Sequence, residues 1–355
     1  MHLRPFSFPV APTFVSKSLI TALCVAGLSG AAFAAIPPVS DAAGVKNYLV
    51  TTVTFMNGAA QEFVKNSDAY AKLVAESGGD YAKVYADHKA DATALVDKMR
   101  ENYKTMDSFG YETIEGIVAG VETLSKFDVD MDAGVPATEG PDDVAQITLK
   151  LSNGETIDKQ GSLFTYIIEP ALWGGDKRWV SPVDLDGNGK LENRESLPKA
   201  EVLTAAAAVA QERIGKLLTD CQAWQPTKAD FFGAMTLMTP TLSEYFEDWK
   251  ESRFAAEQSG HFYAVSRISD MRGIMQSCAI MFKAVAGEVE GKDKALATSV
   301  ATGFDDIFSF LDKIAVREKA GDLTLAEIDE MATQAKDRTD KLVPQIEQAQ
   351  VLTQG

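Results

Sequence analysis

The chain has 355 residues, 46% of them hydrophobic, and its 51 acidic and 34 basic residues give a formal net charge of −17. This charge argues against binding to nucleic acid or to an anionic membrane surface, because both repel an acidic protein. The length is sufficient for one large helical domain or for two adjoining bundles, each with its own core.

The first 34 residues have the pattern of a secretory signal peptide. Arg4 and Lys17 precede an apolar run that ends in Ala-Phe-Ala at residues 32–34, a small-x-small cleavage pattern. The run is shorter than the roughly 20 residues that a membrane-spanning helix needs. We therefore predict cleavage after Ala34 and a periplasmic or secreted mature protein without a transmembrane span. An uncleaved anchor is the alternative.

The rest of the chain is predicted to be mostly helical. Apolar residues recur at helical spacing from Asp41 to about Glu76. A second helical run starts at Tyr81 and extends to Tyr103 or, if Gly110 is tolerated within it, to about Leu124. Further helices are predicted over residues 197–221, 227–239, 243–254, 260–289 and 292–316, and a last helix is capped by Thr324.

One segment between these helices has the pattern of a β-hairpin. Residues 147–151 alternate between apolar and polar, Asn153-Gly154 can turn the chain, and residues 155–158 can return alongside. We therefore predict an all-α fold of two adjoining helical bundles with a small β-hairpin excursion. The bundles would span about 41–221 and about 227–350.

Residues 184–195 read DLDGNGKLENRE and match a calcium loop of the EF-hand type. Gly189 permits the sharp turn, and Leu191 is expected to point inward. The loop has no second loop with which to pair, so we predict a static, structural calcium site within the first bundle. A solvated turn without calcium is the alternative. The oxygen donors at positions 1, 3, 5, 7, 9 and 12 of the loop would come from Asp184, Asp186, Asn188, Lys190, Glu192 and Glu195.

Three glutamates outside this loop are candidate ligands of a second site. Glu112 and Glu115 are three residues apart and share a face if their segment is helical. Glu169 follows Tyr166 by three residues. Three glutamates on apposed helices could build an oxygen site for iron or another divalent cation, but spacing alone favours a solvated Glu112 and hydrogen-bonded partners for the others. Acids also recur over 127–139, where alanine replaces the glycine that a calcium loop needs.

The cysteines and histidines limit the chemistry further. Cleavage after residue 34 would leave Cys221 and Cys278, and such a pair in an oxidising compartment suggests a disulfide, with two buried free thiols as the alternative. The histidines that remain, His88 and His261, are too few for a histidine-rich zinc site. Metal chemistry would therefore rest on oxygen ligands.

Two short segments resemble the imelysin-like family. IIEPALWGGD is similar to the family signature in which Gly-x-His-x-x-Glu continues into Leu-Trp-Gly, with Glu169 at the motif glutamate. YETIEG resembles an upstream Tyr-Glu-x-Ile-Glu segment, with Glu112 and Glu115 at its two acids. Phe164 and Tyr166 replace the motif glycine and histidine, so the imidazole ligand of the motif is absent.

The resemblance extends loosely over residues 40–350. It implies a periplasmic or surface protein made of two helical bundles and associated with iron uptake, in a family of which part carries a metallopeptidase label. We therefore predict a non-enzymatic, exported metal-binding protein in iron acquisition, with a structural calcium site and a membrane iron-transport component as partner. The ligands of its second site would be Glu112, Glu115, Tyr166 and Glu169.

Two alternatives remain. The first is a metallopeptidase that uses the same site, although neither His88 nor His261 lies in a matching motif and hydrolytic zinc sites use histidine ligands. The second is a helical adhesion or polymer-binding module whose calcium site is purely structural.

Overall fold

The computed structural model describes residues 39–132, 146–160, 162–191, 195–246, 249 and 267–354. The predicted signal peptide, residues 1–34, lies outside the described residues. Among the helices that are described, none combines the length and the apolar character needed to cross a membrane.

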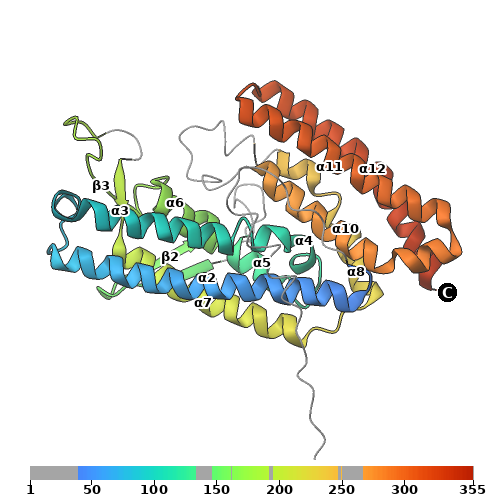
Figure 1. Ribbon diagram of the computed structural model, residues 1–355, viewed down its shortest axis with the longest axis horizontal. Coiled ribbons are helices and arrows are strands. Elements are labelled where there is room, and N and C mark those ends of the chain that lie inside the picture. The colour runs from blue at the N-terminus through green and yellow to red at the C-terminus, as the bar shows by residue number, and fades with distance from the viewer. Residues whose placement is uncertain are drawn as a thin grey trace, which may run out of the picture. The chain divides into compact units, whose positions relative to one another are not determined.

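Two long helices, α3 and α7, each pack along a third, α2 (Figure 1). Helix α2 spans Ala42–Glu76, close to its predicted bounds, and the side chain of Asp41 caps its first turn. Helix α3 spans Tyr81–Met106 and is kinked at His88, whose backbone is not helical. Helix α7 spans Ala200–Ala223.

Four further helices lie in the C-terminal part of the chain. They are α8 (Lys228–Met238), α10 (Arg267–Lys292), α11 (Lys294–Ala320) and α12 (Leu325–Gln354). Helix α10 packs on the other three and also contacts α2. The predicted all-α class is thereby confirmed, whereas the division into two bundles stays a prediction.

The second predicted helix does not continue to Leu124. It ends at Met106, and the chain turns through Gly110 into a single 3-10 turn, η2 (Tyr111–Thr113), and the short helix α4 (Glu115–Val118). A Cβ atom on Gly110 would lie 2.5 Å from the Thr105 carbonyl oxygen. The chain therefore turns at a point where its own backbone leaves no room for a side chain.

Short elements follow these turns. Helix α5 spans Lys126–Met131, and the predicted hairpin is confirmed as the antiparallel strands β1 (Gln146–Lys150) and β2 (Thr156–Gln160). A π-helical turn, η3 (Phe164–Ile168), leads directly into helix α6 (Glu169–Trp173).

A second antiparallel pair, β3 (Val180–Pro182) and β4 (Ser196–Pro198), was not expected from the sequence. Leu197 and Pro198 were predicted to begin a helix but belong to β4, and α7 begins only at Ala200. These two strands flank the predicted calcium loop, so a β-hairpin and not a pair of helices holds that loop in place.

Candidate metal centre

Five acidic side chains gather at the point where α10 meets η2 and α4. One oxygen each of Asp107, Glu112 and Asp132 lies within 4.8 Å of the others, and the same is true of Glu112, Glu115 and Asp270. Four of the five are buried, with relative exposures of at most 5%, and Asp132 is half-buried. We refer to these five residues as the carboxylate cluster.

The cluster is assembled from distant parts of the chain. Asp107 follows the last residue of α3, and Asp132 follows the last residue of α5. Glu112 lies in η2, Glu115 begins α4, and Asp270 lies in the first turn of α10.

Two glycines allow η2 and α4 to approach the backbone of α10. A Cβ atom on Gly273 would lie 2.5 Å from the carbonyl oxygen of Glu112, and one on Gly116 would lie 2.8 Å from the carbonyl oxygen of Ile274. Because backbone atoms cannot yield as a flexible side chain can, both positions require glycine for this packing. The Ser277 hydroxyl on α10 also donates a hydrogen bond to the Thr113 carbonyl at 2.9 Å.

Two oxygens of the cluster are buried without a hydrogen-bond partner among the described residues. They are Oδ1 of Asp107 and Oε2 of Glu112. The other oxygen of Asp107 accepts a hydrogen bond from the Ser108 hydroxyl at 3.1 Å. An unsatisfied buried acceptor costs about 1–3 kcal/mol, and more when it is charged. A bound cation would remove this cost at both atoms.

Burial and like charge act against ionisation of the cluster in the absence of a cation. Burial raises the pKa of Asp107 well above its usual range, and the carboxylates of Asp132 and Glu169 raise this pKa further. Burial also raises the pKa of Asp270 well above its usual range. A cation between these groups would oppose both effects, because it stabilises the ionised carboxylates.

The residues beside Glu115 favour an oxygen site over a thiolate site. The Tyr245 hydroxyl donates a hydrogen bond to Oε1 of Glu115 at 2.6 Å. Burial, together with the charge of Glu115, raises the pKa of the Cys278 thiol to about 12. Among the described residues, neither group of close ligand atoms includes a cysteine, so the donors gathered here are carboxylate oxygens.

The predicted disulfide is absent. Cys221 and Cys278 are both buried free thiols, so the alternative left open by the sequence is the one that the structure contains. Burial raises the pKa of the Cys221 thiol to about 12 as well.

The predicted second site is only partly assembled in this cluster. Glu112 and Glu115 come together, whereas Glu169 is buried at the start of α6 and belongs to neither group of close oxygens. Its charge nevertheless acts on Asp107. Tyr166 is buried in η3, and its backbone carbonyl accepts a hydrogen bond from the Trp179 indole at 2.9 Å.

Three residues of the carboxylate cluster were not predicted from the sequence as ligands of this site. Asp132 belongs to an acid-rich run that was weighed only as a calcium loop. Asp107 and Asp270 lie in segments without a metal-binding pattern, where no spacing rule selects them. Their position just after one helix and just inside another gives no signal until the helices are packed.

The predicted calcium loop brings three of its acidic side chains close together. Asp184, Asp186 and Glu195 each offer an oxygen within 4.8 Å of the others. The backbone N–H groups of Gly187 and Gly189 donate hydrogen bonds to the two oxygens of Asp184 at 2.7 and 2.8 Å. Both glycines have positive φ angles, 78° and 80°, which side chains disfavour.

Two of the remaining predicted ligand positions are described by the structure, and one is not. Asn188 and Lys190 are joined by a hydrogen bond from the Lys190 N–H to the Asn188 side-chain oxygen at 2.8 Å, and Glu192 lies outside the described residues. The prediction for Leu191 is wrong, because its side chain is 63% exposed. A loop between two short strands has no helical core beside it into which this leucine could be buried.

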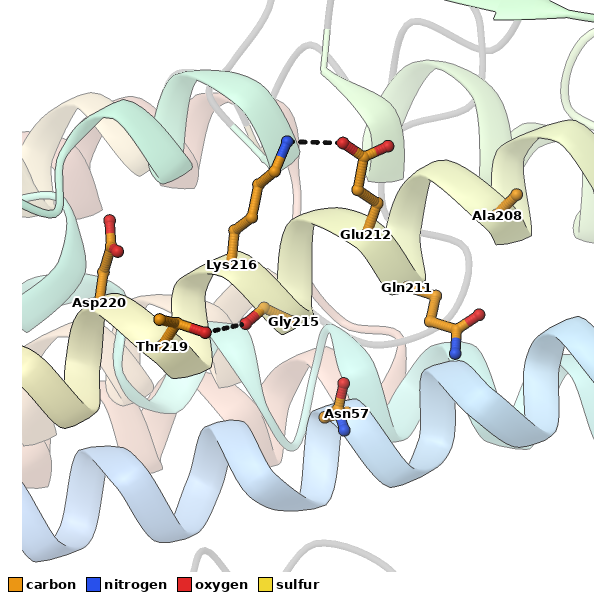
Figure 2. Close-up of a pocket in the computed structure, with 8 residues that line it drawn as sticks. All are labelled: Asn57, Ala208, Gln211, Glu212, Gly215, Lys216, Thr219 and Asp220. Atoms are coloured by element: carbon orange, nitrogen blue, oxygen red, sulfur yellow. Dashed lines mark hydrogen bonds and ion pairs between the residues drawn. The ribbon is translucent and has the colours of Figure 1, made fainter.

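A surface groove lies elsewhere in the described structure. It has a volume of about 570 Å³ and is formed by α7 and one residue of α2, Asn57 (Figure 2). Its charged groups include Lys216 and Glu212, which pair with each other at 2.5 Å on the exposed surface. No residue of the carboxylate cluster lines this groove.

The fold and the cluster define the class of protein: a helical protein that buries several carboxylates among its packed elements. The sequence model of the imelysin family, also described as peptidase M75, matches residues 140–351. The chain therefore belongs to the imelysin family, as the resemblance predicted. The match includes the IIEPALWGGD segment, whereas the YETIEG segment and the rest of residues 40–139 lie outside it. A comparison with curated proteins found no match.

Proposed function

We propose that this protein is an exported, non-enzymatic metal-binding protein that acts in iron acquisition and binds iron at the carboxylate cluster. The observation that carries the proposal is the pair of buried oxygens on Asp107 and Glu112 that lack a partner among the described residues. Membership of the imelysin family supports the link to iron and a periplasmic or extracellular location. A membrane iron-transport component would then receive the metal.

The chemistry of the cluster suits a hard cation. All its side-chain donors are carboxylates, and carboxylate-rich sites between helices are known for pairs of iron or manganese ions. A hydrolytic zinc site generally uses histidine together with an open position for water. The donor set therefore favours metal binding over the peptidase alternative.

Iron content tests this function. Protein purified without chelator is expected to carry iron, and Glu112→Gln is expected to lower the affinity by more than about tenfold, because even the loss of an outer partner of a metal ligand commonly costs 10–100-fold. The matched control is Asp91→Asn, which removes an exposed carboxylate from α3. Unchanged iron content in Glu112→Gln would contradict the assignment, and zinc-dependent proteolysis by the parent protein would support the peptidase instead.

We also propose that the loop at residues 184–195 binds calcium and stabilises the β3–β4 connection. The support is the gathering of Asp184, Asp186 and Glu195 together with a match to the calcium-loop pattern. Calcium would tie the two ends of the loop together, since Asp184 lies near its start and Glu195 at its end.

Thermal melting tests the calcium proposal. In calcium at about 100 times the dissociation constant, binding stabilises the folded protein by about 2.7 kcal/mol. Asp184→Ala is therefore expected to lower the melting temperature by several degrees in calcium and to have little effect in chelator. Equal shifts under the two conditions would show that Asp184 acts without calcium.

A further inference from the structure

We propose that the carboxylate cluster holds two cations, bridged by Glu112. This inference rests on the proposed function, since it assumes that the cluster is a metal site. It adds the number of ions and a role for the three aspartates.

The geometry separates the cluster into two groups. Asp107 and Asp132 share a group with Glu112, and Glu115 and Asp270 share another with Glu112. Two oxygens bound to one cation at about 2.0–2.6 Å lie at most about 4–5 Å apart. The oxygens within each group satisfy that limit, so each group can close around one ion.

Glu112 is the residue common to both groups. A carboxylate has two oxygens and can therefore offer one to each of two ions. Oε2 of Glu112 is buried and has no hydrogen-bond partner among the described residues, so this atom is available as a ligand. Ions in known two-metal sites lie about 3.5–4 Å apart, a separation that one carboxylate spans.

Charge balance also favours two ions. The five carboxylates carry five negative charges when all are ionised. One divalent cation would leave three of them uncompensated, whereas two divalent cations would leave one. Because uncompensated charge is costly in a buried position, the second ion relieves a cost that the first leaves in place.

The donor atoms indicate the class of cation. The two groups contain carboxylates and neither histidine nor cysteine. Such a set suits hard cations such as manganese and iron better than zinc or copper.

Manganese(II) is the probe for this inference, because an exchange-coupled pair differs from an isolated ion in its electron paramagnetic resonance spectrum. The parent for the experiment is the full chain carrying Asp184→Ala, which removes a ligand of the proposed calcium loop and so keeps that loop from adding to the count. After metal removal and titration with Mn²⁺, we expect two ions per chain and a spectrum of coupled ions.

Variants in the parent background assign the two positions. Asp132→Asn and Asp270→Asn are each expected to reduce the count to one ion and to give the spectrum of isolated Mn²⁺. Glu112→Gln is expected to abolish the coupling. Asp91→Asn, the exposed control, should match the parent in both count and spectrum.

The outcomes distinguish the inference from the function on which it rests. One uncoupled ion per parent chain would overturn the two-cation inference and leave the proposed metal site intact. No bound Mn²⁺, combined with no bound iron, would overturn both. The count on the parent chain requires no cluster variant to fold.

Discussion

Replacement of Gly273 by alanine is expected to destabilise the protein by about 3 kcal/mol, the upper end of the usual cost of overpacking. The added Cβ would lie 2.5 Å from the Glu112 carbonyl oxygen, and both groups belong to backbone that cannot rotate away. The contact would push η2 from α10. Because Asp270 lies on α10 and Glu112 on η2, the same displacement would separate cluster ligands and weaken metal binding.

The matched control for this change lies on the same helix. Gly287 also belongs to α10, and a Cβ atom there meets no other group within 4 Å. Gly287→Ala is therefore expected to stabilise the protein by about 0.5 kcal/mol, because alanine restricts the unfolded chain. Chemical denaturation of the two variants measures both values. A Gly273→Ala variant as stable as the parent and with full metal content would show that the close approach is not required.

Glu112→Gln is expected to raise the stability of the metal-free protein and to remove the stabilisation by metal. In chelator, the variant lacks one of several buried acids, and its amide has no ionised form that burial and like charge would disfavour. With cation at about 1,000 times its dissociation constant, the parent gains about 4 kcal/mol, and the variant gains little. The order of the two melting temperatures should therefore reverse between the two conditions.

This reversal separates a metal site from an ordinary network of buried acids. If Glu112 served only as a hydrogen-bonding group, its loss would destabilise the protein in chelator and in metal alike. Asp91→Asn again serves as the control, because its exposed side chain should change neither melting curve. A lower melting temperature for Glu112→Gln under both conditions would refute the role of Glu112 as a ligand.

Features that depend on residues close together in the chain could be predicted from the sequence. Helical spacing placed α2 and α7 within a few residues, because the apolar face of a helix is set by residues that are close in the sequence. Asn153-Gly154 placed the β1–β2 hairpin for the same reason. Resemblance of short motifs also predicted the imelysin family, whose sequence model matches residues 140–351.

Predictions from local sequence patterns were wrong where tertiary packing determines the structure. The run after α3 has helical residues, yet the chain turns at Gly110, where the Thr105 carbonyl leaves no room for a side chain. Leu191 occupies an inward position in the calcium-loop pattern, yet strands in place of helices leave it exposed. The paired cysteines suggested a bridge, yet both are buried as free thiols.

Some residues of the carboxylate cluster could be predicted from the sequence, and others could not. Glu112 and Glu115 could be selected from the sequence because they are close neighbours in one motif. Asp107, Asp132 and Asp270 could not, because they come from three separate segments that meet only when η2 and α4 pack against α10. That packing depends on the absence of side chains at Gly116 and Gly273, and a close approach between two backbones is a property of the tertiary structure.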